Sequence, residues 1–400
     1  MTDTADVVVV GGGIVGASIA YLLAKDGLDV VMMDGEGIGS GSTGHGHGVV
    51  SLVGKDFRPG DHFELGRVGA AMFKEFAEML QEDSGIDPMY HEKPGLSIAI
   101  LDEEERIFRE ASDRLQDQGL GLRWIDGAQA REVEPRISEE CVGGVLYWHG
   151  QVDGYRMSVC EAQALERLGG RILLRRVTGL LRQGDRVVGV RHASGEVHAG
   201  FVVLAMGAWV REAEQWLDFP IPVRPLHGEV LNVRLPGEPL RAFILTARHG
   251  PILQRKDGIT LVGSIGGVTM SGMDVDARHV FDPEDRSPPV FDLQAKPENG
   301  QLMVERGMRV MPALSEADLV DHLAGVRPLS ADRMPIIGFV PGLEGAVLAT
   351  GHGTKGIHLA PITARMVEDL VLHGENRQPV PYQTFLPDRF AGVSLQAPAR

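Results

Sequence analysis

Cysteine is nearly absent from this sequence, which holds only Cys141 and Cys160 among its 400 residues. The two lie far apart and form no C-x-x-C pair, so we predict no disulfide framework, no iron-sulfur cluster and no bound metal. Long hydrophobic runs are also missing, and no stretch approaches the roughly 20 apolar residues that span a bilayer. The first apolar strand begins by Val7, which leaves no room for a signal or transit peptide. We therefore expect a cytoplasmic protein without a membrane span.

Basic residues are in deficit, with 39 Lys and Arg against 55 Asp and Glu, and the formal net charge is -16. This charge would repel nucleic acid and anionic membranes, so neither is expected as a partner. An anionic substrate would have to be held by local cations. A length of 400 residues exceeds one ordinary core and predicts two domains.

Glycine, by contrast, is abundant, with 52 residues, and its most informative use directly follows the apolar run 7–10. Gly11 lets the chain turn sharply out of the strand, and Gly13 lets the backbone approach a pyrophosphate. Gly16 lets the following helix lie close to the sheet. This strand, glycine turn and helix together predict a site for a dinucleotide.

The expected helix adds its own chemistry to this turn. Ile14 and Val15 lie in its first turn, where unpaired amide N–H groups and the positive end of the helix dipole stabilise phosphate. Asp34 ends the next apolar strand, 23 positions after the first glycine, where a carboxylate can bind two ribose hydroxyls. An acidic residue at this place favours FAD or NAD over NADP.

Hydrophobic periodicity predicts an α/β fold combined with α+β: a Rossmann-type dinucleotide-binding domain interleaved with an antiparallel-sheet domain. We expect residues 1–85, 151–219 and 323–400 in the first domain, and residues 86–150 and 220–322 in the second. The segment 282–300 is expected to be an exposed loop, and the last helix is expected to open at Pro361 and stop at Gly374. Helices are predicted over 14–25, 65–83, 102–118 and 157–168, and strands over 30–33, 95–101, 143–148, 171–177, 180–182, 187–192 and 201–205.

Four segments carry a family resemblance. They are the glycine turn 11–16, the stretch 202–209, residues 325–328 with 332–338, and the loop 351–356 with 359–361. In this order they resemble the D-amino acid oxidase superfamily of flavoproteins, which contains glycine oxidase, sarcosine oxidase and the dimethylglycine and sarcosine dehydrogenases. The resemblance implies FAD as cofactor and a small amine or amino acid as substrate. It thereby implies that the Rossmann-type domain is an FAD-binding domain and that the antiparallel-sheet domain is a substrate domain.

The resemblance also implies which residues contact FAD. Residues near the end of a returning strand would pass the adenosine, and Val177 would offer backbone groups to the adenine. The loop 351–356 precedes the last helix, whose positive end would point at the flavin pyrimidine ring. The implied cofactor-binding residues are Gly11, Gly13, Ile14, Val15, Gly16, Asp34, Gly41, Ser42, Thr43, His45, His47, Gly48, Val49, Val177, Ala205, Gly207, Trp209, Arg327, Gly351, Gly353, Thr354 and Lys355.

A glycine-serine loop at 39–48 leaves the mode of FAD attachment open. In dimethylglycine and sarcosine dehydrogenases a similar Gly-Ser-Thr-x-His stretch carries the histidine that binds FAD covalently. His45 is the corresponding candidate here, with His47 second. This sequence departs from the family pattern at Gly44, where an aromatic residue is usual. Many relatives hold FAD without a covalent bond, so both forms remain open.

Two cations are candidates for holding a substrate carboxylate. Lys355 matches the position of a sarcosine-oxidase lysine, and Arg327 matches a glycine-oxidase arginine with the same role. A carboxylate needs such a partner in a dry pocket of a strongly acidic protein. We therefore place Lys355, Arg327 and, as a guess for the pocket, His249 at the catalytic centre.

The sequence thus predicts oxidation of a C–N bond in a small amino acid or a secondary amine that is N-methylglycine-, proline- or opine-like. One alternative substrate is a 2-hydroxy acid, for which His249 or His227 would act as the base. Another alternative is a flavin-carrying subunit within a heteromeric amine dehydrogenase complex. The oxygen-activating lysine of monomeric sarcosine oxidases is matched only by Lys256 in an expected surface turn, which favours an electron acceptor other than oxygen.

Overall fold

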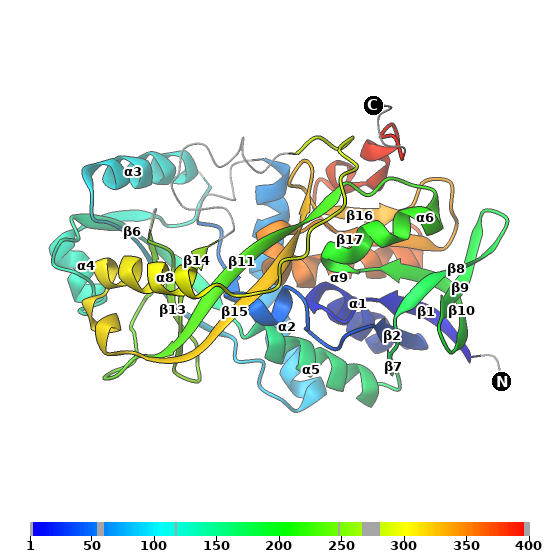
Figure 1. Ribbon diagram of the computed structural model, residues 1–400, viewed down its shortest axis with the longest axis horizontal. Coiled ribbons are helices and arrows are strands. Elements are labelled where there is room, and N and C mark those ends of the chain that lie inside the picture. Colours follow the sequence, from blue (N-terminus) through cyan, green and yellow to red (C-terminus); the bar gives the residue numbers. More distant parts are fainter. Residues whose placement is uncertain (1–2, 54–59, 117, 247–248, 266–280, 396–400) are drawn as a thin grey trace.

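The computed structural model describes residues 3–53, 60–116, 118–246, 249–265 and 281–395. Two sheets organise this part of the chain and lie side by side along the long axis of the molecule (Figure 1). The first sheet has the order β16-β17-β10-β1-β2-β7, with the β8–β9 hairpin joined to β10. Its strands are β1 (Asp3–Val10), β2 (Val30–Asp34), β7 (Arg171–Leu174), β8 (Val177–Gln183), β9 (Arg186–His192), β10 (Gly195–Leu204), β16 (Ile336–Phe339) and β17 (Ala346–Thr350).

The centre of the first sheet is parallel, as the Rossmann-type prediction requires. β1 pairs in parallel with β2 on one side and with β10 on the other, so that Val7 lies beside Val30 and Phe201. Side chains alternate between the two faces of a strand. Val7 and Val9 therefore pack in the core under the helices, whereas Val8 and Val10 pack in the core on the opposite face. Burial on both faces explains the unbroken apolar run.

Four helices cover one face of this sheet: α1 (Ile14–Lys25), α2 (Asp61–Ser84), α5 (Gly154–Arg167) and α9 (Gly356–His373). The predicted helix over 14–25 is confirmed, and α2 begins four residues before its predicted start. The predicted opening of the last helix at Pro361 is wrong, because α9 begins at Gly356 and contains Pro361 in its second turn. The proline is tolerated there at the cost of one helical hydrogen bond. Gly374 ends α9 in the left-handed conformation, as predicted.

The second sheet is mostly antiparallel and follows the order β15-β11-β14-β13-β12-β4-β6-β3, with β5 on β6 and a parallel pairing of β12 with β4. Its two longest strands, β11 and β15, pair from Val223–Ser330 to Arg234–Asp318 and cross the middle of the molecule (Figure 1). The strands are β3 (Val49–Val50), β4 (His91–Ala99), β5 (Arg123–Asp126), β6 (Gly143–Gln151), β11 (Val223–Arg234), β12 (Phe243–Thr246), β13 (Ile252–Gln254), β14 (Ile259–Ile265) and β15 (Asp318–Ser330).

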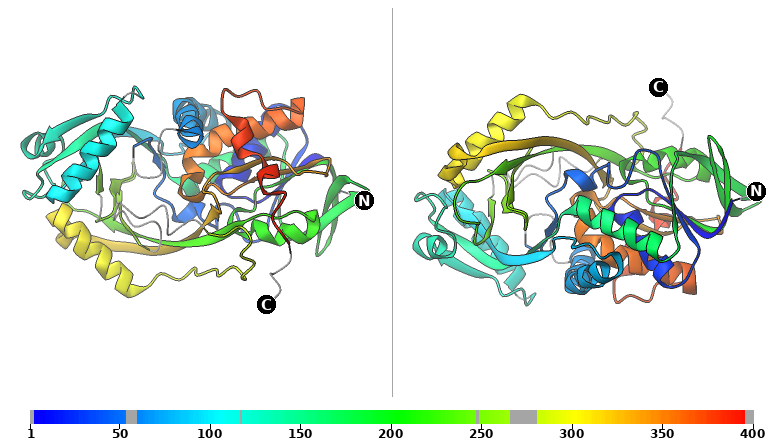
Figure 2. Two further views of the ribbon diagram at one scale, coloured as in Figure 1. Left: turned by 90° about the horizontal axis from the view of Figure 1, so that it is seen from above. Right: turned by 90° about the horizontal axis from the view of Figure 1, so that it is seen from below.

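The helices α3 (Asp102–Gln116), α4 (Gly127–Val133) and α8 (Pro297–Val310) lie at the end of the molecule that holds the second sheet (Figures 1 and 2). α8 corrects the sequence prediction, because residues 297–300 begin this helix instead of ending a loop. Pro297 suits the first helical turn, and Met303, Gly307 and Val310 form its buried stripe. The Pro- and acid-rich composition before the helix concealed its start.

The predicted strand over 171–177 is divided in the structure. β7 ends at Leu174 and pairs in parallel with β2, whereas β8 starts at Val177 and pairs with β9. The residue limits of the two predicted domains stay a prediction. In the structure, both β3 and the whole of β15 pair in the second sheet. No helix in the described ranges is both long and apolar enough to cross a membrane.

Candidate active site

The turn between β1 and α1 is so closely packed that only glycine fits at positions 11 and 16. Gly11 has a φ of 116°, and a Cβ built on it would lie 2.2 Å from the carbonyl oxygen of Ala205. A Cβ on Gly16 would lie 1.9 Å from the carbonyl oxygen of Gly11. The end of β10, the turn and the first turns of α1 are therefore in direct backbone contact. This arrangement brings the N-terminus of α1 to the edge of the sheet.

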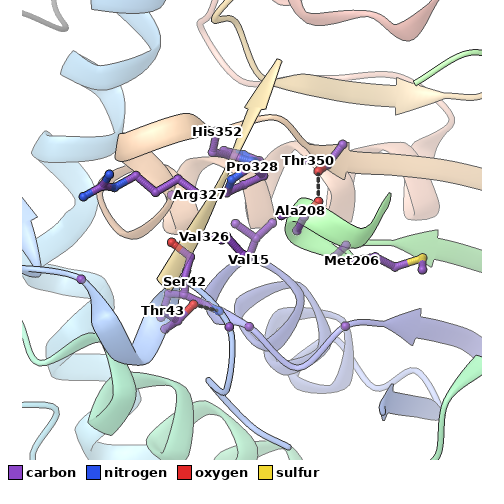
Figure 3. A pocket seen from close by; sticks show the side chains of 18 of the residues that line it. Val15, Ser42, Thr43, Met206, Ala208, Val326, Arg327, Pro328, Thr350 and His352 are labelled. Atoms are coloured by element: carbon purple, nitrogen blue, oxygen red, sulfur yellow. Dashed lines mark hydrogen bonds between the residues drawn. The ribbon is translucent and has the colours of Figure 1, made fainter. Parts of the chain in front are cut away.

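A long pocket begins at this edge. Its lining comes from segments that are distant in the sequence, including both sheets and the start of α9. Figure 3 shows Ser42 and Thr43 beside the start of α1, with Val326, Arg327 and His352 further along the pocket. The lining residues lie within 10–15, 33–36, 40–53, 175–177, 205–212, 326–328 and 349–357, together with Leu245 and Pro251.

Asp34 is held rigidly at one end of the long pocket. Its Oδ2 accepts a hydrogen bond from the N–H of Gly12 at 2.7 Å, and its Oδ1 accepts from Glu36 and Gly37 at 2.8 Å each. Three backbone donors fix the carboxylate, and Asp34 still lines the pocket. A fixed carboxylate beside a helix N-terminus is the arrangement that recognises a ribose next to a diphosphate.

The loop after β2 folds over the start of α1. The N–H of Ile14 donates a hydrogen bond to Thr43 Oγ1 at 3.0 Å, which satisfies one of the unpaired amides of the first helical turn. Gly13, the N-cap residue, has no side-chain capping bond. Gly13, Ile14 and Val15 all line the long pocket. The helix thus presents its positive end to whatever occupies this region.

Arg327 and Lys355 line the other end of the long pocket. Arg327 lies on β15, and its Nη1 donates to the carbonyl oxygen of His227 at 3.2 Å. Lys355 ends the short 3-10 helix Gly353–Lys355 and is buried. Leu245 and Pro251 add apolar wall from the second sheet. The two cations therefore lie in the same pocket as the glycine turn, although 311 and 339 residues separate them from Gly16.

The histidines around this end are held neutral. Burial, with a smaller contribution from the charge of Arg327, lowers the pKa of His47 to about 4. Burial also lowers the pKa of His352 to about 3, and that of His358 to about 3 with a contribution from Lys355. His358 accepts from the Ser51 N–H through Nδ1 at 3.2 Å and donates from Nε2 to the Gly66 carbonyl at 2.8 Å.

Most residues named from the sequence come together in the long pocket. Their roles stay predictions, but their positions agree with one continuous site. The predicted residues that line it are Gly11, Gly13, Ile14, Val15, Asp34, Gly41, Ser42, Thr43, His47, Gly48, Val49, Val177, Ala205, Gly207, Trp209, Arg327, Gly353, Thr354 and Lys355.

Four predicted residues lie outside this lining. Gly16 packs against the turn, and Gly351 takes a φ of 75° beside Ser330 and Ile336. His45 lines a second, smaller pocket with Asp153 and Arg255, and its Nδ1 lies 2.7 Å from the carbonyl oxygen of Gly41. His249 Nε2 lies 3.9 Å from Glu104 Oε1 on α3.

His227, the other base considered for a hydroxy acid, is also absent from the lining. Its Nδ1 bonds to the Asp292 carbonyl at 2.8 Å, and its Nε2 bonds to Glu229 Oε1 at 2.9 Å. Both ring nitrogens therefore have protein partners. Neither base named for the hydroxy acid alternative reaches the long pocket.

Sequence reasoning missed several residues of the long pocket. His352 lies within the glycine loop 351–356, so the signal was present, but no role was assigned to it. Arg176 and Glu212 line the pocket near Asp34 and form an ion pair at 2.7 Å. The ion pair connects Arg176, which directly precedes β8, to Glu212 in the 3-10 helix Gly207–Ala213. No local pattern in the sequence indicates this contact.

Residues 6–370 match the protein family described as FAD dependent oxidoreductase (DAO). The chain belongs to the FAD-dependent oxidoreductase family. The matched range of the family contains every lining residue of the long pocket. Relatives in this family include the hydrogen cyanide synthase subunit HcnC of Pseudomonas aeruginosa, which is 30% identical over 98% of this chain and 97% of the relative.

Other members of the FAD-dependent oxidoreductase family carry the name glycine oxidase. The glycine oxidase of Pseudomonas putida is 30% identical over 94% of this chain and 97% of its own length. The solved structure of glycine oxidase from Bacillus cereus superposes with a TM-score of 0.84 at 27% identity, covering 98% of this chain and 99% of that chain. The predicted fold, with its nucleotide-binding sheet and second antiparallel sheet, is thereby confirmed.

Proposed function

We propose that this protein oxidises the C–N bond of a small amino acid or secondary amine with FAD bound in the long pocket. The observation that supports this most directly is the shared pocket of the glycine turn, Arg327 and Lys355. It combines a place for a dinucleotide with positive charge for a substrate carboxylate. The family is FAD-dependent, and relatives at 27% to 30% identity are named glycine oxidase.

The residues present fit FAD. Glycine at positions 11 and 16 allows the close backbone contacts that bring the N-terminus of α1 to the pocket, and the fixed Asp34 carboxylate lies at the same end. In this proposal Gly13, Ile14 and Val15 hold the diphosphate through the positive end of α1. Gly356 and Ile357, at the start of α9, line the opposite end and place a second positive helix end there.

Bound FAD supplies a hydride acceptor for the substrate carbon next to nitrogen. The chain's own groups bind and orient the substrate: Arg327 and Lys355 pair with the carboxylate, and Leu245 and Pro251 exclude water. Because the histidines at this end of the pocket are neutral, Arg327 and Lys355 supply its positive charge. The resulting imine is hydrolysed by water.

A second candidate function is the flavin-carrying subunit of a heteromeric amine dehydrogenase complex. The observation that favours it is the 30% identity to a hydrogen cyanide synthase subunit across 98% of this chain. Copurification of further chains from the native host would support it. The hydroxy acid alternative has no comparable observation, since His249 and His227 lie outside the long pocket.

We also infer that FAD is held without a bond to His45, because the ring of His45 lines the smaller pocket and its Nδ1 is paired with Gly41. The proposed electron acceptor is not oxygen. Lys256, the candidate oxygen-activating lysine, pairs with Asp87 at 2.6 Å and is half exposed, so it does not reach the long pocket.

The test is anaerobic bleaching of the flavin in the purified protein. We expect glycine, N-methylglycine, proline or iminodiacetate to reduce the flavin, and methylamine, which lacks the carboxylate, to fail. Dye reduction is then compared with peroxide release in air to identify the acceptor. A colourless protein that takes up no FAD, or bleaching by glycolate but by none of the amines, contradicts the proposal.

A further inference from the structure

The backbone of His47 and Gly48 is hydrogen-bonded to Gln151, the last residue of β6, and to Val152, which follows it. Gln151 Nε2 donates a hydrogen bond to the carbonyl oxygen of His47 at 3.0 Å. The N–H of Val152 donates to the carbonyl oxygen of Gly48 at 2.9 Å. Gly48 has a φ of 68°, and a Cβ there would lie 1.7 Å from the Val152 carbonyl oxygen. The position from which the His47 side chain enters the long pocket is therefore fixed.

One hydrogen bond also fixes the tautomer of His47. Its Nε2 lies 2.6 Å from the carbonyl oxygen of Gly263 on β14. A carbonyl oxygen can only accept, so Nε2 carries the proton and Nδ1 keeps a lone pair. Among the residues that the structure describes, none donates a hydrogen bond to Nδ1.

The side chain of His47 is only partly buried, in contrast to the fully buried ring of His149. Because no described residue donates to Nδ1 and His47 lines the long pocket, the pocket is the side from which a ligand donor can meet this lone pair. The pocket thus contains a fixed acceptor supplied by a neutral ring.

The charge around His47 keeps this acceptor available. Burial and the nearby guanidinium of Arg327 lower the pKa of His47 to about 4, so the ring stays unprotonated at neutral pH. A neutral acceptor near a cation is complementary to a ligand with an N–H donor near an anion. An α-amino acid has this pattern, because its nitrogen and carboxylate are bonded to the same carbon.

We propose that Nδ1 of His47 accepts a hydrogen bond from the substrate amine while Arg327 pairs with the substrate carboxylate. This inference rests on the proposed function and adds a substrate class to it: amino acids whose nitrogen carries at least one hydrogen. Held at both ends, the substrate presents the same C–H bond at every turnover. His47 is then a substrate-binding residue that distinguishes amino acids from carboxylic acids without an N–H.

Two variants separate this role from a structural one. His47→Gln places an amide nitrogen where Nε2 donates to Gly263, but it removes the acceptor at the Nδ1 position. His47→Asn places an oxygen at the Nδ1 position, but it cannot reach Gly263. The probes are N-methylglycine and methoxyacetate, which share a carboxylate and a shape but differ in N–H against ether oxygen. For N-methylglycine the dissociation constant is taken from the concentration dependence of the anaerobic flavin reduction rate, and for methoxyacetate from the flavin absorbance change on binding.

We expect the wild type to bind N-methylglycine more tightly than methoxyacetate, and His47→Gln to bind N-methylglycine about tenfold more weakly. Methoxyacetate binding should stay within about twofold in both variants, and His47→Asn should keep most of the preference for the amine. Flavin content, measured on the same samples, reports cofactor binding separately.

The inference is overturned if the wild type shows no preference for the amine, or if His47→Gln keeps the preference and His47→Asn loses it. Equal weakening of both probes also overturns it, since that pattern indicates general damage to the pocket. These outcomes differ from failure of the proposed function, in which the wild-type flavin is reduced by none of the panel amines.

Discussion

Gly16 contacts Gly11 so closely that a Cβ built on Gly16 would lie 1.9 Å from the Gly11 carbonyl oxygen. Gly16→Ala must therefore push α1 away from the end of β1. We expect a loss of at least about 2 kcal/mol in unfolding free energy and a large loss of bound FAD. Urea unfolding and the flavin-to-protein ratio measure the two effects. The control is Gly392→Ala, where nothing lies within 4 Å; comparable losses in both variants would contradict the explanation.

The stacking of Phe291 on Trp209 supports one wall of the long pocket. The two ring centroids are 5.1 Å apart with an interplanar angle of 13°, and Trp209 lines the pocket. Aromatic pairs contribute about 0.5–1.5 kcal/mol, so Phe291→Ala should weaken FAD binding by about two- to tenfold. Fluorescence titration of the FAD-free protein measures this. Val290→Ala removes a neighbouring side chain that is 77% exposed, and it should leave the affinity unchanged.

The fully buried Glu161 makes stability depend on pH. Its carboxyl accepts a hydrogen bond from Ser18 on α1, and burial raises its pKa well above the ordinary value. The folded state then binds the proton more tightly than the unfolded state, so stability is present at low pH and falls as pH rises above about 4. The expected slope is up to about 1.4 kcal/mol per pH unit until the folded pKa is reached.

Replacing Glu161 with Gln tests this assignment. Gln keeps an oxygen for Ser18 but cannot ionise, so unfolding free energies measured between pH 5 and 8 should decline less steeply than in the wild type. Glu166→Gln, on the exposed side of the same helix, should retain the wild-type slope. Parallel curves for wild type and Glu161→Gln would rule Glu161 out as the source of the pH dependence.

The pairing of His45 with Gly41 predicts the state of the cofactor after denaturation. We expect FAD to separate from the acid-denatured protein, leaving no fluorescent band on a denaturing gel. His45→Ala should resemble the wild type in this assay. A fluorescent wild-type band that disappears in His45→Ala would establish the covalent bond and contradict our inference.

The sequence carried enough information for the nucleotide-binding half of the site. The apolar run before Gly11 and the carboxylate of Asp34 are local signals, because one strand, one turn and one helix create them. His45 and His47 show where such reasoning ends. They stand two residues apart in the same glycine loop, yet only His47 lines the long pocket. Its ring is directed by Gly263, which is 216 residues away in the chain.

The start of α8 was missed for a different reason. The Pro- and acid-rich segment before it is typical of a loop, and the helix becomes recognisable only from the contacts of its buried stripe. Met303 and Val310 pack in the core of the second sheet with Leu231 and Val262. The start of α9 at Gly356 was also missed because the prediction relied on a local signal. Pro361 is typical of a first helical turn, but the 3-10 helix Gly353–Lys355 leads directly into α9 before that proline.

The long pocket is completed by Lys355 and Ile357, which follow the glycine turn by more than 330 residues. During synthesis the glycine turn leaves the ribosome hundreds of residues before these last wall segments exist. A nascent chain that lacks these segments thus has a phosphate turn but no enclosed site, and tight FAD binding has to await their synthesis. Ligand binding of this kind stabilises only the complete fold, which makes retention of the yellow cofactor a direct report of a fully assembled molecule.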